Sequence, residues 1–391
     1  MTSEPPAPSE PTEPPEPHSA TPSDPSAPPP PQAPLPPHEP HTPAPGSLTD
    51  VAGLRVGHAT WAGGGRLTGT TVVLAPEGGA VAAVDVRGGG PGTRETDALD
   101  PRNLVQRVEA VVLTGGSAYG LDAASGVMGW LEERHRGVRV GPEPSHVVPV
   151  VPAACVFDLG RGGDFGARPD AGAGRAAVEA AARKAEFGPV EEGNVGAGTG
   201  AVVGKFKGGV GSASVRLDSG ITVAALVVAN AAGSGVDPET GVLYGRYFAG
   251  RRVAYPAPEV HAAATRRLDE AAAENGAPPL NTTLAVVATD AELTKAQAQK
   301  LAGTSHDGMA RAVRPVHLLN DGDTVFALAT GAHTLPAEHP LALNEILAAG
   351  ADMVTAAIVR AMLAAEPVRT PGGTFPAYRD LYEHETKGAV Q

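Results

Sequence analysis

The chain has 391 residues, long enough for one large domain or two ordinary ones. Its formal net charge of −13 and its pI near 5.4 exclude the basic surface that binding to nucleic-acid phosphates requires. The single cysteine, Cys155, excludes an intrachain disulfide, and its apolar neighbours are typical of a small core residue.

Residues 1–46 form a proline-rich segment that differs in composition from the rest of the chain. It holds 19 of the 39 prolines, no lysine or arginine, and one leucine. Because so few apolar side chains cannot offset the entropy lost on ordering, we expect a disordered tail, either simply solvated or used for interactions. The start of the chain lacks the pattern of a secretory signal, and no apolar run reaches about 18 residues. We therefore expect a cytoplasmic protein without a membrane partner.

Residues 47–391 are predicted to form one domain. Short apolar runs bounded by turn residues predict strands at 48–60, 69–76 and 79–90. Residues 110–137 indicate a strand, a glycine turn and a helix that Gly137 ends, and a second helix follows Pro169. Residues 209–231 predict a hairpin that turns at 218–220.

The second half of the domain continues in mixed order. A helix is predicted at 258–276, strands at 283–291, 313–319 and 324–331, and a long, apolar, buried helix at 340–366. The polar segment 366–391 follows, with part of it expected to dock on the surface. Hairpins and helices in this order favour the α+β class, with antiparallel sheets covered by helices.

The glycine-rich segments do not match known phosphate loops. Between residues 193 and 209, Thr199 stands where a P-loop requires its first glycine, and Phe206 stands where it requires Ser or Thr. The histidines are scattered, and residues 320–323 lack the later carboxylates of a calcium loop. We therefore predict no cofactor and no metal.

Ser117 lies in a Gly-Gly-Ser-Ala-Tyr-Gly segment that is similar to a nucleophile elbow. The second glycine comes one residue late, at Gly120. The favoured role of Ser117 is therefore that of a helix N-cap, although amides in this loop remain candidates for holding an anion.

The polar triplet Asn281-Thr282-Thr283 follows Pro-Pro-Leu and precedes a predicted strand. A threonine hydroxyl is a poor nucleophile without a base, but an α-amine on the same residue, with an ordinary pKa of about 7.7–8.0, can serve as one. The hydroxyl of Thr282 can liberate that amine by attacking the Asn281 carbonyl and shifting the acyl group to oxygen, after which water hydrolyses the ester. On this pattern alone, a polar turn before a strand is the favoured interpretation.

Nine segments between Leu48 and Glu366 carry a family resemblance, among them DVRGGGPGTRETDALDP, VVLTGGSAYGLDAASGV, GNVGAGTGAVVGK, NTTLAVVATDAELTKAQ and NDGDTVFALATG. In this order they resemble the P1-family (S58) peptidases: the L-aminopeptidase/D-esterase, β-aminopeptidase and 6-aminohexanoate-oligomer (nylon) hydrolase group. The resemblance implies a four-layer αββα sandwich that cleaves itself into a larger chain, 47–281, and a smaller chain, 282–391. It also implies a homo-oligomer of cleaved heterodimers.

The resemblance assigns roles to residues around the triplet. Thr282 matches the nucleophile, with self-cleavage between Asn281 and Thr282. Asn230 matches an asparagine that donates to the oxyanion, a role that suits a neutral donor. Asp321 and Asp323 match carboxylates that orient the nucleophile and its amine. Without the resemblance, these last three would be assigned to turns.

Further residues are implied with alternatives. Lys205 matches a lysine near the nucleophile of the nylon-hydrolase-like group, but the segment is short here, so Lys207 is an alternative. The substrate and oxyanion loop comprises Gly115, Gly116, Ser117, Tyr119 and Phe157. Phe157 stands where relatives often have tyrosine, which removes one hydrogen bond to the oxyanion, and Tyr119 is a candidate substitute.

We therefore predict a self-processing threonine hydrolase that cleaves amide bonds of small peptides or amides through an acyl-enzyme, as an aminopeptidase or an oligoamide hydrolase. One alternative is acyl transfer to an amine, as in the ornithine acetyltransferases. Another is an uncleaved, non-catalytic scaffold or binding protein. Motifs do not distinguish L-, D- or β-peptides from synthetic amides, because pocket shape sets that choice.

Overall fold

The structure, a computed structural model, describes residues 46–250, 252–275, 281–336 and 338–382. The predicted tail at 1–46 therefore lies outside the described residues except for Gly46. All described residues belong to one compact unit, Glu39–Gln391.

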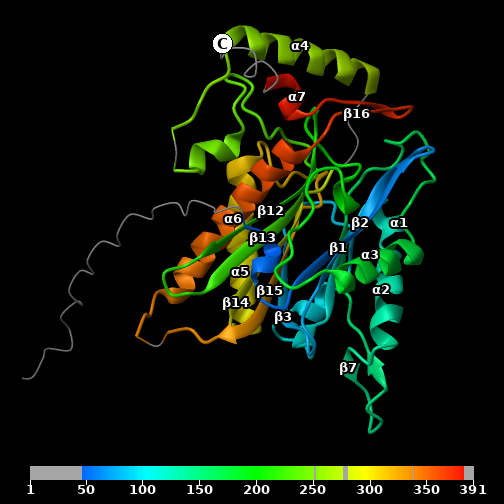
Figure 1. Cartoon of the computed structure of the whole chain (residues 1–391), viewed down its shortest axis with the longest axis vertical. Coiled ribbons are helices and arrows are strands. Elements are labelled where there is room, and N and C mark those ends of the chain that lie inside the picture. The colour runs from blue at the N-terminus through cyan, green and yellow to red at the C-terminus, as the bar shows by residue number, and fades with distance from the viewer. Residues whose placement is uncertain (1–45, 251, 276–280, 337, 383–391) are drawn as a thin grey trace, which may run out of the picture. The chain divides into compact units, whose positions relative to one another are not determined.

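Two β-sheets form the centre of this unit (Figure 1). The five-stranded sheet has the order β1 (Arg55–Gly63), β2 (Arg66–Leu74), β6 (Ala110–Thr114), β9 (Ala153–Cys155) and β4 (Thr93–Arg94). The six-stranded sheet has the order β12 (Gly209–Arg216), β13 (Thr222–Ala229), β14 (Leu284–Ala291), β15 (Thr324–His333), β3 (Ala80–Val86) and β5 (Arg107–Val108). Three small pairs are β7 (Val138–Arg139) with β8 (Val147–Val148), β10 (Val202–Val203) with β11 (Phe206–Lys207), and β16 (Val368–Thr370) with β17 (Gly373–Phe375).

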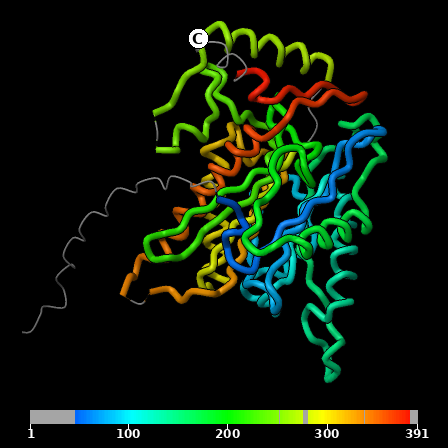
Figure 2. Tube along the Cα trace, in the orientation of Figure 1, coloured from blue at the N-terminus to red at the C-terminus, as the bar shows by residue number. Residues whose placement is uncertain are grey.

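Helices cover both sheets. They are α1 (Ser117–Gly120), α2 (Ala123–Glu132), α3 (Ala171–Arg183), α4 (Pro258–Asn275), α5 (Lys295–Ala312), α6 (Ala342–Ala364) and α7 (Tyr378–Tyr382). One apolar cluster joins α2 and α3 to the five-stranded sheet, a second joins α5 and α6 to the six-stranded sheet, and a third lies between the sheets. Figure 2 shows α5 and α6 on the opposite side of the sheets from α2 and α3.

Strand β14 lies at the centre of the six-stranded sheet. All of its residues are buried, which explains why residues 284–288 form a continuous apolar run rather than an alternating one. It pairs antiparallel with β13 and parallel with β15, and α5 forms the connection that a parallel pair requires. The carboxyl end of β13 and the amino ends of β14 and β15 therefore meet at one edge of the sheet.

The packing of α6 on this sheet depends on small residues. A Cβ placed on Gly211 in β12 would lie 2.1 Å from the backbone oxygen of Ala357 in α6, so a side chain there would push the helix away. The long, buried helix predicted at 340–366 is confirmed as α6. By length and hydropathy α6 would also suit a membrane span, but 61% of its most apolar window is buried inside the protein.

Most predicted elements are confirmed, including the hairpin at 209–231, where Gly220 takes a φ of +84° in the turn. The strand predicted at 313–319 is wrong: Pro315 has no N–H for a ladder, and only an isolated bridge joins Arg314 to Ser234 in this described segment. Residues 48–60 begin with a 3₁₀ turn, Leu48–Asp50, and the strand starts only at Arg55.

Three further local findings concern α5, Cys155 and the C-terminal segment. Helix α5 was not predicted from the sequence, although Thr294 and Gln297 form a capping box at its start. Cys155 is buried in β9, and this burial raises the pKa of its thiol to about 12, as expected for a core residue. The expected docking of the C-terminal segment is confirmed as far as residue 382, with Phe375 and Tyr378 buried.

Candidate active site

Thr282 lies at the sheet edge where β13, β14 and β15 meet. It is 5% exposed, and its backbone N–H donates to the Asn230 carbonyl oxygen at 2.8 Å. Its hydroxyl Oγ1 donates to the carbonyl oxygen of Asn281 at 2.6 Å. Asn281 in turn forms a parallel β-bridge with Asp321, which precedes β15. The Asn281–Thr282 peptide bond is thus held between two neighbouring strand ends, with the hydroxyl against its carbonyl group.

Asn230 follows β13 and is fully buried. Its side-chain oxygen Oδ1 accepts from the Arg161 Nη1 at 2.6 Å and from the Val202 N–H at 3.0 Å. These two bonds fix which way the amide faces, because only an oxygen can accept them. Its Nδ2 is buried and, within the described residues, has no hydrogen-bond partner. A buried, unused donor beside the Thr282 backbone is suited to hold a developing oxyanion.

Asp323 and Asp321 contact the backbone around Thr282. Asp323 Oδ1 accepts from the Thr283 N–H at 2.7 Å, and its Oδ2 accepts from the backbone N–H and the ring Nδ1 of His317. Asp321 accepts from the Leu318 N–H at 3.2 Å, and burial beside the Asp323 charge raises its pKa. The structure brings both carboxylates to this sheet edge, with their hydrogen bonds directed to backbone groups and His317 rather than to the Thr282 hydroxyl.

Gly322, between these carboxylates, faces the nucleophile directly. A Cβ placed on it would lie 2.6 Å from Thr282 Oγ1. Only a residue without a side chain therefore leaves room for the hydroxyl at this position.

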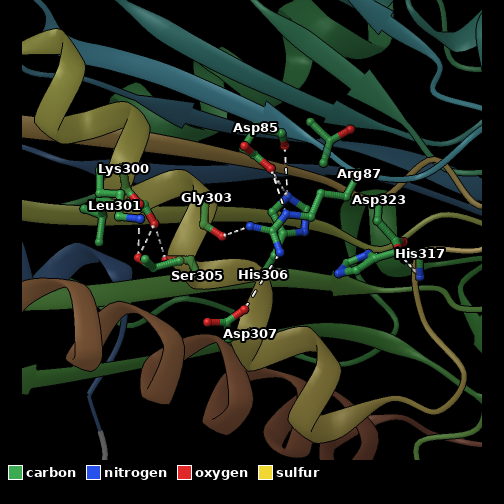
Figure 3. A network of polar contacts seen from close by, with 12 residues as sticks. Asp85, Arg87, Lys300, Leu301, Gly303, Ser305, His306, Asp307, His317 and Asp323 are labelled. Carbon is green, nitrogen blue, oxygen red and sulfur yellow. Dashed lines mark hydrogen bonds and ion pairs between the residues drawn. The ribbon is translucent and has the colours of Figure 1, made fainter.

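Two histidines extend the site behind Asp323, as Figure 3 shows. The rings of His317 and His306 meet edge to face with centroids 4.8 Å apart, and His306 Nε2 lies 3.0 Å from the backbone oxygen of Asp85. Burial lowers the pKa of His306 well below its usual value, so the ring is neutral at pH 7. Arg87 joins this network because it donates to the Asp85 carboxylate at 3.1 Å and to the Gly303 carbonyl oxygen at 2.6 Å. No sequence pattern indicated this network, because Asp85 and Arg87 are more than 200 positions from the residues they contact, His306 and Gly303.

Arg161 is a second feature of the site that was not predicted from the sequence. Its Nη2 donates to the Asn281 Oδ1 at 2.7 Å, and its Nη1 donates to Asn230 Oδ1 and to the Gly200 carbonyl oxygen, both at 2.6 Å. Burial lowers its pKa to about 10, so the guanidinium stays charged at neutral pH. Arg161 directly follows residues 151–160, a segment that carries the family resemblance, and this position was the available signal.

The glycine loop is hydrogen-bonded within the fold. The N–H groups of Gly115, Gly116 and Ser117 donate to the Gly69 oxygen, the Asp158 carboxylate and the Val156 oxygen. The loop therefore does not present these three amides as free donors. Ser117 is the first residue of α1, and Gly116 occupies the N-cap position, so the N-cap prediction for Ser117 is wrong.

The aromatic residues of this loop lie apart from the Thr282 contacts. Tyr119 is 58% exposed, and the guanidinium of Arg168 stacks over its ring at 3.6 Å from the centroid. Phe157 is half-buried. Neither residue lines the cavity beside Asn281.

The two candidate lysines occupy different environments. Lys205 is exposed, pairs with Asp269 at 2.6 Å and lines the cavity. Lys207 is fully buried and donates to the carbonyl oxygens of Gly198 and Gly208. Burial, together with the nearby charge of Arg161, lowers the Lys207 pKa to about 7. Of the two candidate lysines, Lys205 lines the cavity beside Asn281 and Lys207 does not.

A cavity of about 720 Å³ adjoins Asn281. Its wall includes Arg161, Val202 and Lys205 on one side, and α4 and the C-terminal segment contribute Asp269, Phe375 and Tyr382. No three His, Cys, Asp or Glu side chains gather into a metal site in the part of the chain that the structure describes.

Comparison with known proteins shows the family of this chain. Residues 46–375 match peptidase family S58. An uncharacterized aminopeptidase of Mycobacterium tuberculosis (strain ATCC 25618 / H37Rv) is 46% identical over 351 residues, which span 86% of this chain and 98% of that protein. The 6-aminohexanoate-oligomer endohydrolase of Kocuria sp. (strain KY2) is 33% identical over 303 residues, 73% of this chain and 76% of its own.

Among solved structures, the L-aminopeptidase D-Ala-esterase/amidase of Ochrobactrum anthropi, described as a variant of the Ntn-hydrolase fold, superposes with a TM-score of 0.64. It is 24% identical, and the match covers 88% of this chain and 94% of that one. At this identity the likeness concerns the fold alone.

Proposed function

The chain belongs to peptidase family S58, and on that premise we propose that it is a self-processing N-terminal-threonine hydrolase. Family membership supports hydrolysis of peptide or amide bonds. Small peptides and amides are the proposed substrates. The proposal includes the four-layer αββα arrangement, which the three apolar clusters and the likeness to an Ntn-hydrolase variant support. The cytoplasmic location and the homo-oligomer stay predictions.

One observation carries the proposal: the Thr282 hydroxyl lies 2.6 Å from the Asn281 carbonyl oxygen in a buried site. A threonine at the start of a strand most often belongs to a turn. A turn, however, does not explain why the side-chain nitrogen Nδ2 of Asn230 is buried without a hydrogen-bond partner in the described part of the chain. Acyl transfer needs a nucleophile and an oxyanion donor at one carbonyl group, and Thr282 Oγ1 and Asn230 Nδ2 are the groups proposed for these two roles.

In the proposed self-cleavage, Thr282 Oγ1 attacks the Asn281 carbonyl carbon. The carbon–oxygen bond forms, the carbon–nitrogen bond breaks, and the hydroxyl proton passes to the departing α-nitrogen. Water then hydrolyses the ester, which leaves a carboxylate on Asn281 and a free hydroxyl and α-amine on Thr282. The bonds formed and broken balance, so the chain and one water molecule are the only reactants needed.

In the proposed turnover, the liberated α-amine of Thr282 accepts the hydroxyl proton as Oγ1 attacks a substrate amide. Asn230 Nδ2 donates to the oxyanion, since it is already aimed by Arg161 and Val202. The carboxylates of Asp321 and Asp323 raise the amine pKa by their charge and hold the local backbone. Water then releases the acid from the acyl-enzyme.

The test is intact mass spectrometry of the purified protein with Thr282→Ala and Thr283→Ala. Wild type and Thr283→Ala are expected to give fragments that end at Asn281 and begin at Thr282, and Thr282→Ala a single chain. Thr283→Ala is the matched control because it changes the adjacent threonine. An intact wild-type chain, or normal amide turnover by Thr282→Ala, would contradict the proposal. Adding an amine acceptor to the assay separates hydrolysis from acyl transfer by the products.

A further inference from the structure

Arg161, a buried cation in the wall of the cavity beside Asn281, makes one contact that the proposed reaction does not use. Arg161 donates through Nη2 to the side-chain oxygen of Asn281, at 2.7 Å, and both residues line the cavity. The guanidinium is itself buried and held in place by two further acceptors, Asn230 Oδ1 and the Gly200 oxygen. It is therefore a rigid donor aimed at the side chain of the residue whose carbonyl group is attacked.

The inference rests on the proposed function and on one physical argument. Self-cleavage and turnover would use the same hydroxyl, on Thr282, and the same oxyanion donor, on Asn230. A carbonyl group attacked by the same oxygen and held by the same donor must occupy the same place in both reactions. The side chain next to that carbonyl group therefore occupies the same place too. In the uncleaved chain this is the side chain of Asn281. Asn281 therefore occupies the position that the acyl residue of a substrate would take.

Departure of Asn281 after cleavage would leave Arg161 Nη2 without its acceptor. An unsatisfied donor on a buried charge is costly, and a charged hydrogen bond is among the stronger ones. The adjoining cavity of about 720 Å³ gives a substrate access to this position. A substrate that restores the lost acceptor regains that interaction, while an apolar one of the same shape does not.

We propose that Arg161 is the specificity residue on the acyl side of the site. It selects substrates whose acyl residue carries a carbonyl or carboxylate oxygen on its γ-carbon, which is to say asparaginyl and aspartyl amides. The same contact, made with Asn281, also assists self-cleavage. Lys205 and Arg314 also line the cavity, but both are exposed. Lys205 is paired with Asp269, and the Arg314 guanidinium lies over the Tyr244 ring at 5.4 Å from its centroid, so neither supplies this selection.

The first test uses the wild-type enzyme and a matched substrate pair. Asparagine and leucine side chains have the same heavy-atom skeleton, so asparaginyl and leucyl 4-nitroanilides differ chiefly in the acceptor. The expected kcat/KM is about 10- to 100-fold higher for the asparaginyl substrate, as the loss of one hydrogen bond to a charged group implies. Equal values, or a preference for leucine, would overturn the inference.

Two variants test the residue itself. Arg161→Lys keeps the charge but not the forked geometry, so the asparaginyl-to-leucyl ratio should fall toward one even if overall activity drops. Asn281→Leu removes the acceptor from the chain's own acyl residue and should slow self-cleavage by about the same 10- to 100-fold factor. Because the substrate pair and Asn281→Leu leave Arg161 intact, the inference remains testable if Arg161→Lys does not fold.

The outcomes separate this inference from the proposed function. Cleaved wild type that hydrolyses both anilides equally overturns the selection by Arg161 and leaves the hydrolase intact. A wild-type chain that neither cleaves nor hydrolyses overturns both. An asparaginyl preference that persists unchanged in Arg161→Lys overturns the assignment to Arg161 and points to another donor.

Discussion

The substitution Asn230→Asp isolates one atom of the site. In the structure, Oδ1 of Asn230 accepts hydrogen bonds from Arg161 and from the Val202 N–H, and an aspartate offers the same acceptor in the same place. The change therefore retains the contacts that hold the side chain. It replaces only Nδ2, the donor that has no partner in the described part of the chain, with an oxygen.

The expected loss of rate follows from that one donor. Removing a single oxyanion-hole donor costs about 10²–10³ in kcat, or about 2.7–4 kcal/mol. A carboxylate at this position also repels the developing oxyanion, which acts in the same direction. Stability should change little, because the buried guanidinium of Arg161 keeps an acceptor. Asn230→Ala should instead lower the melting temperature, since it leaves the Arg161 and Val202 donors unsatisfied, at about 1–3 kcal/mol each.

The assay is a time course of self-cleavage by intact mass spectrometry, with thermal melts of the same samples. Asn230→Asp should be isolated largely uncleaved and with a melting temperature near that of the uncleaved Thr282→Ala protein. Asn230→Ala should be both slow and less stable. Complete and rapid cleavage of Asn230→Asp would refute the role of Nδ2, and unfolding of Asn230→Asp would refute the hydrogen-bond assignment.

Three further predictions concern other parts of the site and fold. Gly322→Ala should purify uncleaved by mass spectrometry, because its Cβ would lie 2.6 Å from Thr282 Oγ1; normal cleavage would contradict that crowding. His317→Ala should slow cleavage about tenfold because Asp323 loses the ring donor, and His317→Asn, which tolerates the residue's φ of +58°, should recover part of the rate; equal rates in all three proteins would argue against it. Burial lowers the His58 pKa from 6.5 to about 4. As the pH falls, the unfolded chain therefore takes up a proton on His58 before the folded chain does. Stability should fall by up to about 3 kcal/mol as pH drops from 6.5 to 4, and His58→Asn should flatten that fall in urea titrations; parallel curves would contradict the burial argument.

Local patterns were sufficient to predict much of the fold. The hairpin around Gly220 and the apolar run of β14 were visible because each depends on neighbouring residues. The strand predicted at 313–319 failed at Pro315, where the missing N–H outweighs the β-branched neighbours. Helix α5 was missed although its capping box at Thr294 was readable.

The site was harder to predict because it is assembled across the chain. Thr282 and Asn230 were assigned through a resemblance, and the sheet order explains why they lie together, since antiparallel β13 ends where β14 begins. The contact of Arg161 with Asn281 joins residues 120 positions apart, and neither local periodicity nor charge indicates it. Burial of Lys207, next to the exposed Lys205, likewise depends on the packing around the β10–β11 turn.

The order of the six-stranded sheet has a consequence for how the two proposed fragments hold together. Strands β14 and β15 belong to the fragment after Thr282, while β13 on one side and β3 on the other belong to the fragment before it. The small fragment is therefore interleaved with the large one and cannot depart without opening two rows of backbone hydrogen bonds. Folding before the cut is a unimolecular process, and refolding after it is bimolecular. If the proposed cut occurs, the melting temperature of the cleaved protein should rise with concentration while that of the uncleaved Thr282→Ala chain does not. The uncut chain would then bring the strands of both fragments together in one folding step before the cut.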